Sequence, residues 1–139
     1  MLGSRRQGRE AALQVLYLND SGLKDIGAVP AAVWSEAPLA PKIREFAQRL
    51  AEGVVNRQPV IDALIKKYAE NWEIKRMAAI DRSILRLAAY ELLHEPETPI
   101  NVIINEALEI AKKYSTAESS KFVNGILDKI KLERVHGAS

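Results

Sequence analysis

The stretch from Met77 to Leu93 constrains the fold more than any other part of the chain. Its apolar residues recur at three- and four-residue steps on two neighbouring faces, which is the period of an α-helix. The rows are Met77, Ile80, Ile84, Leu87, Ala88 and Leu92, and beside them Leu85, Ala89 and Leu93. A helix that is apolar over most of its circumference is usually buried inside a bundle. We therefore predict a central buried helix with the other helices packed around it.

Four charged residues interrupt this apolar stretch: Asp81, Arg82, Arg86 and Glu91. A charge that is removed from water without compensation is costly. Each of the four is therefore expected to reach water, an oppositely charged partner or a ligand.

Further helices are indicated before the central one. The segment 4–18 has an apolar face and begins with Ser4 and Gln7, which fit a capping box. The segment 42–56 carries one clear apolar stripe, and Pro59 suits the start of the next helix. Between them, the segment 19–41 is rich in Gly and Pro, and only a short helix over 31–36, with Trp34 packing inward, is expected there.

Two helices are indicated after the central one. Thr98 and Pro99 predict a helix start, with threonine as N-cap and proline at the first position. Ser115 to Glu118 matches a capping box that opens the last helix. Gly125 lies within that helix, where glycine is unfavourable, so we expect close contact with another backbone. Residues from Arg134 onward are expected to fray.

These elements predict an all-α fold of six to seven helices, in two small packed helical bundles around the central buried helix. No strand-like alternation of useful length occurs. A chain of 139 residues corresponds to one domain or two closely packed subdomains. We treat 1–139 as a single domain with approximate subdomains 1–72 and 73–139.

Bulk properties narrow the functional classes. No apolar run approaches the ~20 residues that span a bilayer, and the N-terminus lacks the apolar stretch of a secretory signal. Cysteine is absent, which removes disulfide and thiol chemistry and agrees with a cytoplasmic location. The net charge of +2 is too small to imply nucleic-acid binding by itself. The distribution of charge therefore has to carry any such argument.

The opening turns of the first predicted helix carry Arg5, Arg6 and Arg9. Cations at this end oppose the helix dipole by roughly 0.3–1 kcal/mol each when exposed, so folding alone favours Asp or Glu there. One interpretation is a solvated basic end or a disordered tail. The other is an anion site, because arginine forks and helix N-termini both suit phosphate oxygens.

Phe122 lies one step off the core row of the last helix, between Lys121 and Val123, with Asn124 close by. An exposed ring beside a cation and an amide suits stacking on an unpaired base. The simpler interpretation is that Phe122 covers a seam between helices. Both interpretations place the ring at the rim of the bundle.

Catalysis and metal binding find little support in the sequence. His94 and His136 stand apart, without metal-ligand spacing, and no glycine-rich phosphate loop is present. Glu106 and Glu109 are interpreted as ordinary charge on a helix surface. We therefore expect no catalytic residue, no metal ligand and no cofactor.

Three blocks resemble the family of the bacterial antitermination factor NusB. They are RRQGREAALQVLY at 5–17, ILRLAAYEL at 84–92 and PINVIINEALEIAKKYSTAESSKFVNGILDKI at 99–130. The resemblance covers nearly the whole chain and is weakest across 21–75. It implies two packed helical bundles, binding of single-stranded boxA RNA from rRNA operon leaders, and a heterodimer with the ribosomal protein NusE. It also implies assembly with elongating RNA polymerase and the other Nus factors.

The resemblance assigns roles to individual positions. Arg5, Arg6 and Arg9 match the basic motif of the family, and Tyr17 matches its nearby aromatic residue. Lys121 and Phe122 match its base-contacting helix start. Residues expected to modulate RNA or partner affinity are Glu118, Asp81 and, as a weaker candidate, Arg86.

A second hypothesis is a helical protein-interaction module that acts mainly as a homodimer. Its arginines would pair with carboxylates of another subunit. The sequence leaves the choice between monomer and homodimer open.

Overall fold

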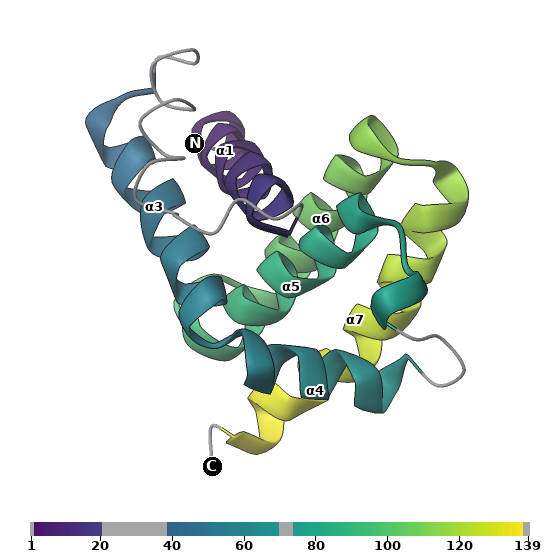
Figure 1. The fold of residues 1–139 in the computed structure, drawn as a ribbon. Coiled ribbons are helices and arrows are strands. Elements are labelled where there is room, and N and C mark those ends of the chain that lie inside the picture. The colour runs from purple at the N-terminus through teal and green to yellow at the C-terminus, as the bar shows by residue number, and fades with distance from the viewer. Residues whose placement is uncertain (1, 21–38, 70–73, 138–139) are drawn as a thin grey trace.

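The computed structural model describes residues 2–20, 39–69 and 74–137 of the chain (Figure 1). The helix expected over 31–36, with Trp34, lies outside the described residues. Within them the structure contains α-helices and one short 3₁₀ helix and no strand. The elements are α1 (Leu2–Asp20), α3 (Pro41–Asn56), α4 (Gln58–Tyr68), η1 (Ile74–Arg76), α5 (Ala79–His94), α6 (Ile100–Tyr114) and α7 (Ala117–Gly137). The prediction of an all-α fold is confirmed.

The helix α5 lies at the centre, as its apolar circumference predicts. It contacts α1, α3, α4, α6 and α7, and Figure 1 shows these helices around it. Every residue from Ser83 to Leu92 is buried. The helix begins at Ala79 rather than near Met77, because the chain before it forms η1. The small residues Ala88 and Ala89 keep its surface narrow where neighbouring helices approach.

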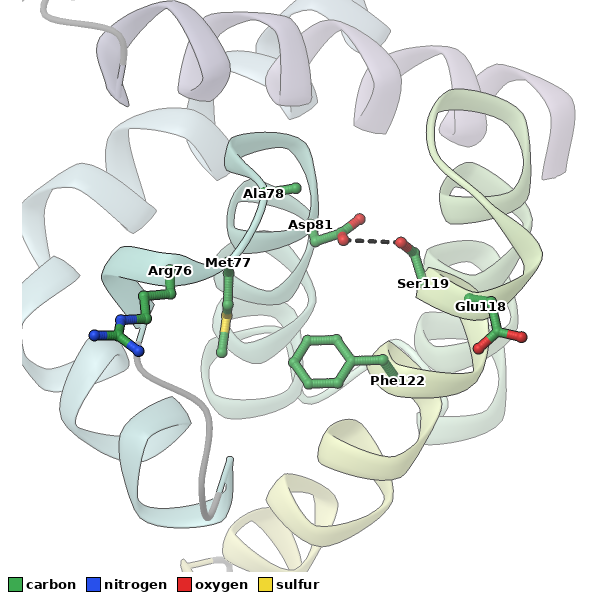
Figure 2. A pocket seen from close by; sticks show the side chains of 7 residues that line it. All are labelled: Arg76, Met77, Ala78, Asp81, Glu118, Ser119 and Phe122. Carbon is green, nitrogen blue, oxygen red and sulfur yellow. Dashed lines mark hydrogen bonds between the residues drawn. The ribbon is translucent and has the colours of Figure 1, made fainter.

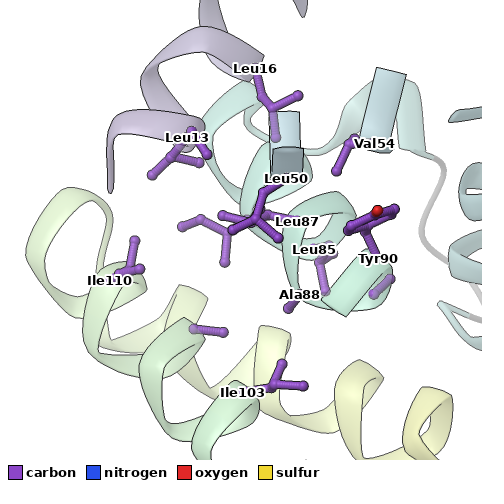
Figure 3. Packing of buried hydrophobic residues seen from close by; sticks show 14 of the residues in the cluster. Leu13, Leu16, Leu50, Val54, Leu85, Leu87, Ala88, Tyr90, Ile103 and Ile110 are labelled. Atoms are coloured by element: carbon purple, nitrogen blue, oxygen red, sulfur yellow. The ribbon is translucent and has the colours of Figure 1, made fainter. Parts of the chain in front are cut away.

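One apolar core joins the helices around α5 (Figure 3). Leu13 and Leu16 of α1 and Leu50 of α3 meet Leu85 and Leu87 of α5, and Ile103 and Ile110 enter from α6. Burial of a leucine or isoleucine side chain contributes about 1.5–3 kcal/mol. This shared core fixes the positions of the polar side chains at its edges.

Three helix starts differ from the predicted caps. The helix α1 begins at Leu2, so Ser4 lies within it and is no N-cap. The helix α6 begins at Ile100, with Pro99 as the preceding residue and no side-chain cap from Thr98. At α7 the capping oxygen is Thr116 Oγ1, which accepts a hydrogen bond from the Ser119 amide at 2.9 Å. The N-cap of α7 is therefore Thr116, one residue after the Ser115 that begins the predicted capping box.

The close approach to another backbone that was expected at Gly125 is wrong, because no other described segment comes within 4 Å of the position of an added Cβ. Glycine is required elsewhere. A Cβ at Gly53 of α3 would clash with the Tyr90 ring of α5, and one at Gly8 of α1 would lie 2.8 Å from the Phe46 ring of α3. These two glycines let α3 pack closely against α5 and α1.

The prediction that the chain frays from Arg134 onward is wrong at Arg134 itself. The Arg134 guanidinium donates hydrogen bonds to the carbonyl oxygens of Glu91, Leu92, Glu95 and Thr98. Carbonyls at a helix C-terminus lack intrahelical donors. Arg134 therefore caps the end of α5 and anchors α7 to it.

The division into subdomains 1–72 and 73–139 stays a prediction. The helix α4 contacts both α5 and α7, and α1 contacts α5, so packing crosses this boundary. Among the described residues, no helix has the length and apolarity to cross a membrane.

Candidate nucleic-acid interface

Arg9 is part of the protein interior. It is 3% exposed, and its guanidinium donates hydrogen bonds to both carboxylate oxygens of Glu91 on α5, at 2.8–3.1 Å. Burial raises the pKa of Glu91, although the hydrogen bonds from Arg9 oppose the rise. A buried guanidinium that is held in this way is not presented to solvent. The structure is therefore at odds with a direct RNA contact by Arg9.

Arg6 lies one turn earlier, at the surface, and pairs with Glu106 of α6. The Arg6 side chain is 41% exposed, whereas that of Glu106 is 4% exposed. Glu106 also lies 3.5 Å from Arg9, so the interpretation of Glu106 as surface charge was wrong. The hydrogen bond from Arg6 to Glu106 raises the pKa of Arg6. Arg6 thus keeps its charge and an outward face while Glu106 fixes its position.

Arg5 is exposed and lies over the buried Phe46 ring of α3, with its guanidinium carbon 4.2 Å from the ring centroid. Arg9 and Arg49 contact the same ring, each at 5.4 Å. A guanidinium over an aromatic face is attracted by the ring quadrupole. Phe46 therefore holds arginines from two helices at one seam.

Arg86 is buried and belongs to a second ion-pair network. It donates to both carboxylate oxygens of Asp62 on α4, at 2.7 and 2.9 Å, and to Asp20 at the end of α1. Arg82 also binds Asp20 and donates to the Ile74 and Met77 carbonyls. The network joins three helices and η1. A contact of Arg86 with RNA or a partner is therefore at odds with its position.

The seam between α1 and α6 carries residues that the sequence reasoning missed. Lys113 and Tyr114 of α6 both donate to Glu10 of α1, at 2.7 Å each. The Lys113 ammonium also lies over the Tyr114 ring, 5.2 Å from its centroid. A cation beside a 42% exposed ring resembles the predicted Lys121–Phe122 pair in chemistry. The available signal was the KKY triplet at the end of an amphipathic helix.

A pocket of about 240 Å³ opens beside the start of α7 (Figure 2). Its lining includes Arg76, Met77, Asp81, Glu118, Ser119 and Phe122. Ser119 donates to Asp81 Oδ2 at 2.8 Å, which links α7 to α5 above the Phe122 ring. Asp81 is 7% exposed, and its Oδ1 accepts no hydrogen bond from the described residues. The pocket therefore combines an aromatic ring with an under-satisfied carboxylate.

The predicted site residues form two groups. Arg5 and Arg6 lie near the start of α1, while Asp81, Glu118 and Phe122 meet at the pocket, with the exposed Lys121 on the same turn as Phe122. Phe122 is partly buried against the core, so it lies at the rim as both interpretations required. The α1–α6 seam, with Lys113 and Tyr114, lies between the groups along α6.

Tyr17 is separated from the arginines. It is exposed and lies eleven residues after Arg6 on the same helix, which corresponds to roughly 17 Å at 1.5 Å per residue. One turn later, Asp20 binds Arg82 at the N-terminal end of α5. Tyr17 is therefore near the end of α1 that meets the N-terminal end of α5, away from Arg5 and Arg6.

Metal chemistry has no visible site among the residues that the structure describes. No group of three His, Asp or Glu side chains there could hold a metal ion. His94 lies in the last turn of α5, where burial and the nearby Arg57 lower its pKa.

Comparisons with known proteins identify relatives of the whole chain. A family model described as the NusB family matches residues 6–131. The transcription antitermination protein NusB of Elusimicrobium minutum is 46% identical, over 98% of this chain and 99% of its own length. A solved structure of T. maritima NusB has a TM-score of 0.86 and 42% identity, covering 93% of this chain and 91% of that chain.

A structure of the antitermination factors NusB and NusE in complex with dsRNA matches with a TM-score of 0.87 and 28% identity. The match covers 95% of this chain and 98% of that chain. The family model, the relatives and the fold agree over almost the full length of the chain. The chain therefore belongs to the NusB family.

Proposed function

We propose that this protein is a transcription antitermination factor that binds boxA-type single-stranded RNA together with NusE. In this role it joins elongating RNA polymerase and the other Nus factors in the cytoplasm. Its relatives are transcription antitermination proteins, and a structural neighbour is a complex of NusB and NusE with dsRNA. The proposed role is binding, without catalysis.

The observation that carries this proposal is a series of exposed or partly exposed cations and rings on α1, α6 and α7. The series has three pairs. The start of α1 carries Arg5 and Arg6, and the α1–α6 seam carries Lys113 and Tyr114. The pair beside the pocket is Lys121 and Phe122. Cations that track phosphates and rings that stack on bases are the usual elements of single-strand binding. Arg9 supports this surface from below by holding α1 to α5.

Asp81 and Glu118 are proposed to modulate partner or RNA affinity, and the exposed Tyr17 is proposed as a separate RNA contact. The pocket carboxylates disfavour phosphate and favour a donor or a cation from a bound molecule. We therefore place the phosphates outside the pocket, beside Lys121, and the partner contact nearer Asp81. The buried Arg86 acts on this region only through the positions of α1 and α4.

Fluorescence anisotropy across a salt series tests RNA binding directly. Labelled single-stranded boxA-type RNA is titrated with the protein, with and without NusE. We expect log Kd to change linearly with log salt, with a slope of about 0.7 per neutralised phosphate. Arg6→Gln should reduce the slope, while a matched charge change at the exposed Lys66 of α4 should not.

A scrambled strand and the boxA duplex serve as competitors. Equal binding of all three RNAs, with or without NusE, would contradict the proposal. The homodimer hypothesis is examined in the same samples by light scattering. A dimer that RNA does not dissociate, and whose surface includes Arg6, would favour the protein-interaction module instead.

A further inference from the structure

An arginine group around Phe46 shares Arg5 with the proposed RNA-binding surface and also includes Arg9 and Arg49. Phe46 belongs to α3 and is 3% exposed, and three guanidiniums lie within 5.4 Å of its ring centroid. Arg9 is buried, whereas Arg5 and Arg49 reach solvent, the Arg49 side chain with 51% exposure. None of the residues to which the family resemblance assigns a role lies in α3, the helix that carries Arg49.

Most donors of the two exposed guanidiniums have no acceptor among the described residues. Arg5 donates no hydrogen bond to the described residues, and Arg49 uses a single nitrogen, Nη2, which donates to Glu95 Oε1 at 2.7 Å. A guanidinium carries five N–H donors in a fixed fork. Stacking on one rigid ring limits the motion of both forks, so less conformational entropy is lost when they bind an anion.

We infer that Arg5 and Arg49, both held on Phe46, form a phosphate clamp across the α1–α3 seam that extends the RNA-binding surface onto α3. The inference rests on the proposed function, because the anion it binds is the phosphodiester backbone of the same RNA. Both guanidinium carbons lie within 5.4 Å of one ring centroid, which keeps them close enough to contact neighbouring phosphates.

Glu95 has a definite part in this arrangement. Its side chain is 7% exposed and shares one Arg49 nitrogen, so it positions the fork and competes with phosphate. If Arg49 only fastened α3 to the end of α5, loss of Glu95 would weaken the fold and leave RNA affinity unchanged. If Arg49 binds phosphate, loss of the Glu95 charge should strengthen RNA binding. The two roles therefore predict different results.

Anisotropy with the labelled boxA-type RNA tests the clamp in the full-length protein. We expect Arg49→Gln to raise Kd about three- to fivefold and to reduce the salt slope by about 0.7, the value for one phosphate contact. The control Arg44→Gln removes the same charge from an exposed position of α3 that does not contact Phe46. It should leave the slope unchanged.

Two further variants separate binding from folding. Glu95→Gln should lower Kd about twofold or more, and Phe46→Leu, which keeps the core filled, should raise Kd as Arg49→Gln does. Thermal melts identify any variant that fails to fold. If Arg49→Gln or Phe46→Leu fails to fold, the direction of the change in Kd for Glu95→Gln decides whether Arg49 binds phosphate. Equal slopes for Arg49→Gln and Arg44→Gln, or no gain with Glu95→Gln, would overturn the clamp. Absence of binding by the unaltered protein would instead refute the proposed function.

Discussion

Two regions of the molecule treat buried charge differently. Around Arg9 of α1, the buried carboxylates of Glu91 on α5 and Glu106 on α6 pair with the guanidinium. At the start of α7, the buried Asp81 carboxylate has only the Ser119 hydroxyl as a donor among the described residues. The first region holds helices together and gives little to solvent. The second region borders an open pocket with Phe122 in its lining. The charges around Arg9 have ionic partners within the fold, although Arg9 Nη1 and Glu106 Oε1, which lie 3.5 Å apart, make no hydrogen bond among the described residues. What distinguishes Asp81 is that its carboxylate lines a pocket that another molecule can enter.

A similar contrast separates neighbouring arginines of α1. Arg9 has two carboxylates within 3.5 Å and is enclosed, while Arg5, one turn earlier, stacks on Phe46 and has no hydrogen-bond acceptor among the described residues. Identical side chains in one basic motif therefore have different roles. The predictions below test this division, beginning with the largest expected effect.

Arg9→Ala should lower the free energy of unfolding by about 3–5 kcal/mol, because it leaves Glu91 buried without its partner. Urea denaturation followed by circular dichroism measures this loss. Arg5→Ala is the matched control on the same helix, and its stability should remain within about 0.5 kcal/mol of the original. The division between the two arginines would be refuted if Arg9→Ala kept its stability and lost RNA affinity instead.

Phe122→Ala should weaken RNA binding by about 1–3 kcal/mol if the ring stacks on a base. Part of its apolar area is buried against the core, so a moderate loss of stability is also expected. Leu64→Ala on α4 is the control, since Leu64 is another partly buried core neighbour, away from the cationic series. A ring that merely covers a seam would leave RNA affinity the same in both folded variants.

Asp20→Asn should lower stability by about 1 kcal/mol at pH 7, by weakening hydrogen bonds to Arg82 and Arg86. Burial alone would raise the pKa of Asp20, but these hydrogen bonds outweigh it and bring the pKa below 3.8. The stabilisation is therefore complete above pH 3.8 and is lost as pH falls through the lower folded-state pKa.

Urea titrations of Asp20→Asn and the original protein at several pH values measure this dependence. The difference in stability should be constant near neutrality and should shrink below pH 3.8. Asp128→Asn, which removes an exposed carboxylate near Lys131, is the control and should show almost no difference. A pH-independent difference for Asp20→Asn would show that the ion pairs to α5 are not its cause.

Helical periodicity was enough to predict the helices and the central place of α5, because burial repeats with the helical period whatever the partner helix is. It also held a signal for the buried charges that went unused. Arg9, Glu91 and Glu106 each continue an apolar row of their own helix, at three- or four-residue steps from Leu13, Ala88 and Ile103. One arginine and two glutamates in core rows predict that the arginine pairs with the carboxylates.

The remaining features depend on contacts between distant segments. Arg134 reaches carbonyls about forty positions away, and Gly53 needs no side chain because Tyr90 occupies that space. No local pattern marks either position. The pocket is likewise formed by residues 76–81 and 118–122, which the fold brings together. The family resemblance pointed to several of these residues, but their burial and partners come only from the structure.

Gly125→Ala should raise stability by about 0.4–1 kcal/mol, since Gly125 lies within α7 with open space around a Cβ. The gain comes from the smaller conformational freedom of alanine in the unfolded chain. Gly125 follows Phe122 by three residues, so the same variant also reports on the surface beside the pocket. Gly53→Ala, where a Cβ meets the Tyr90 ring, is the opposite control and should lose stability.

RNA affinity of Gly125→Ala then sharpens the comparison between the two regions. If the bound strand lies only over Phe122 and Lys121, an extra methyl group one turn further along α7 should leave Kd unchanged. A stabilised variant with weaker RNA binding would show that the strand passes directly over Gly125. The open face of α7 would then belong to the binding surface, and the absence of a side chain at this position would serve the ligand and not the fold.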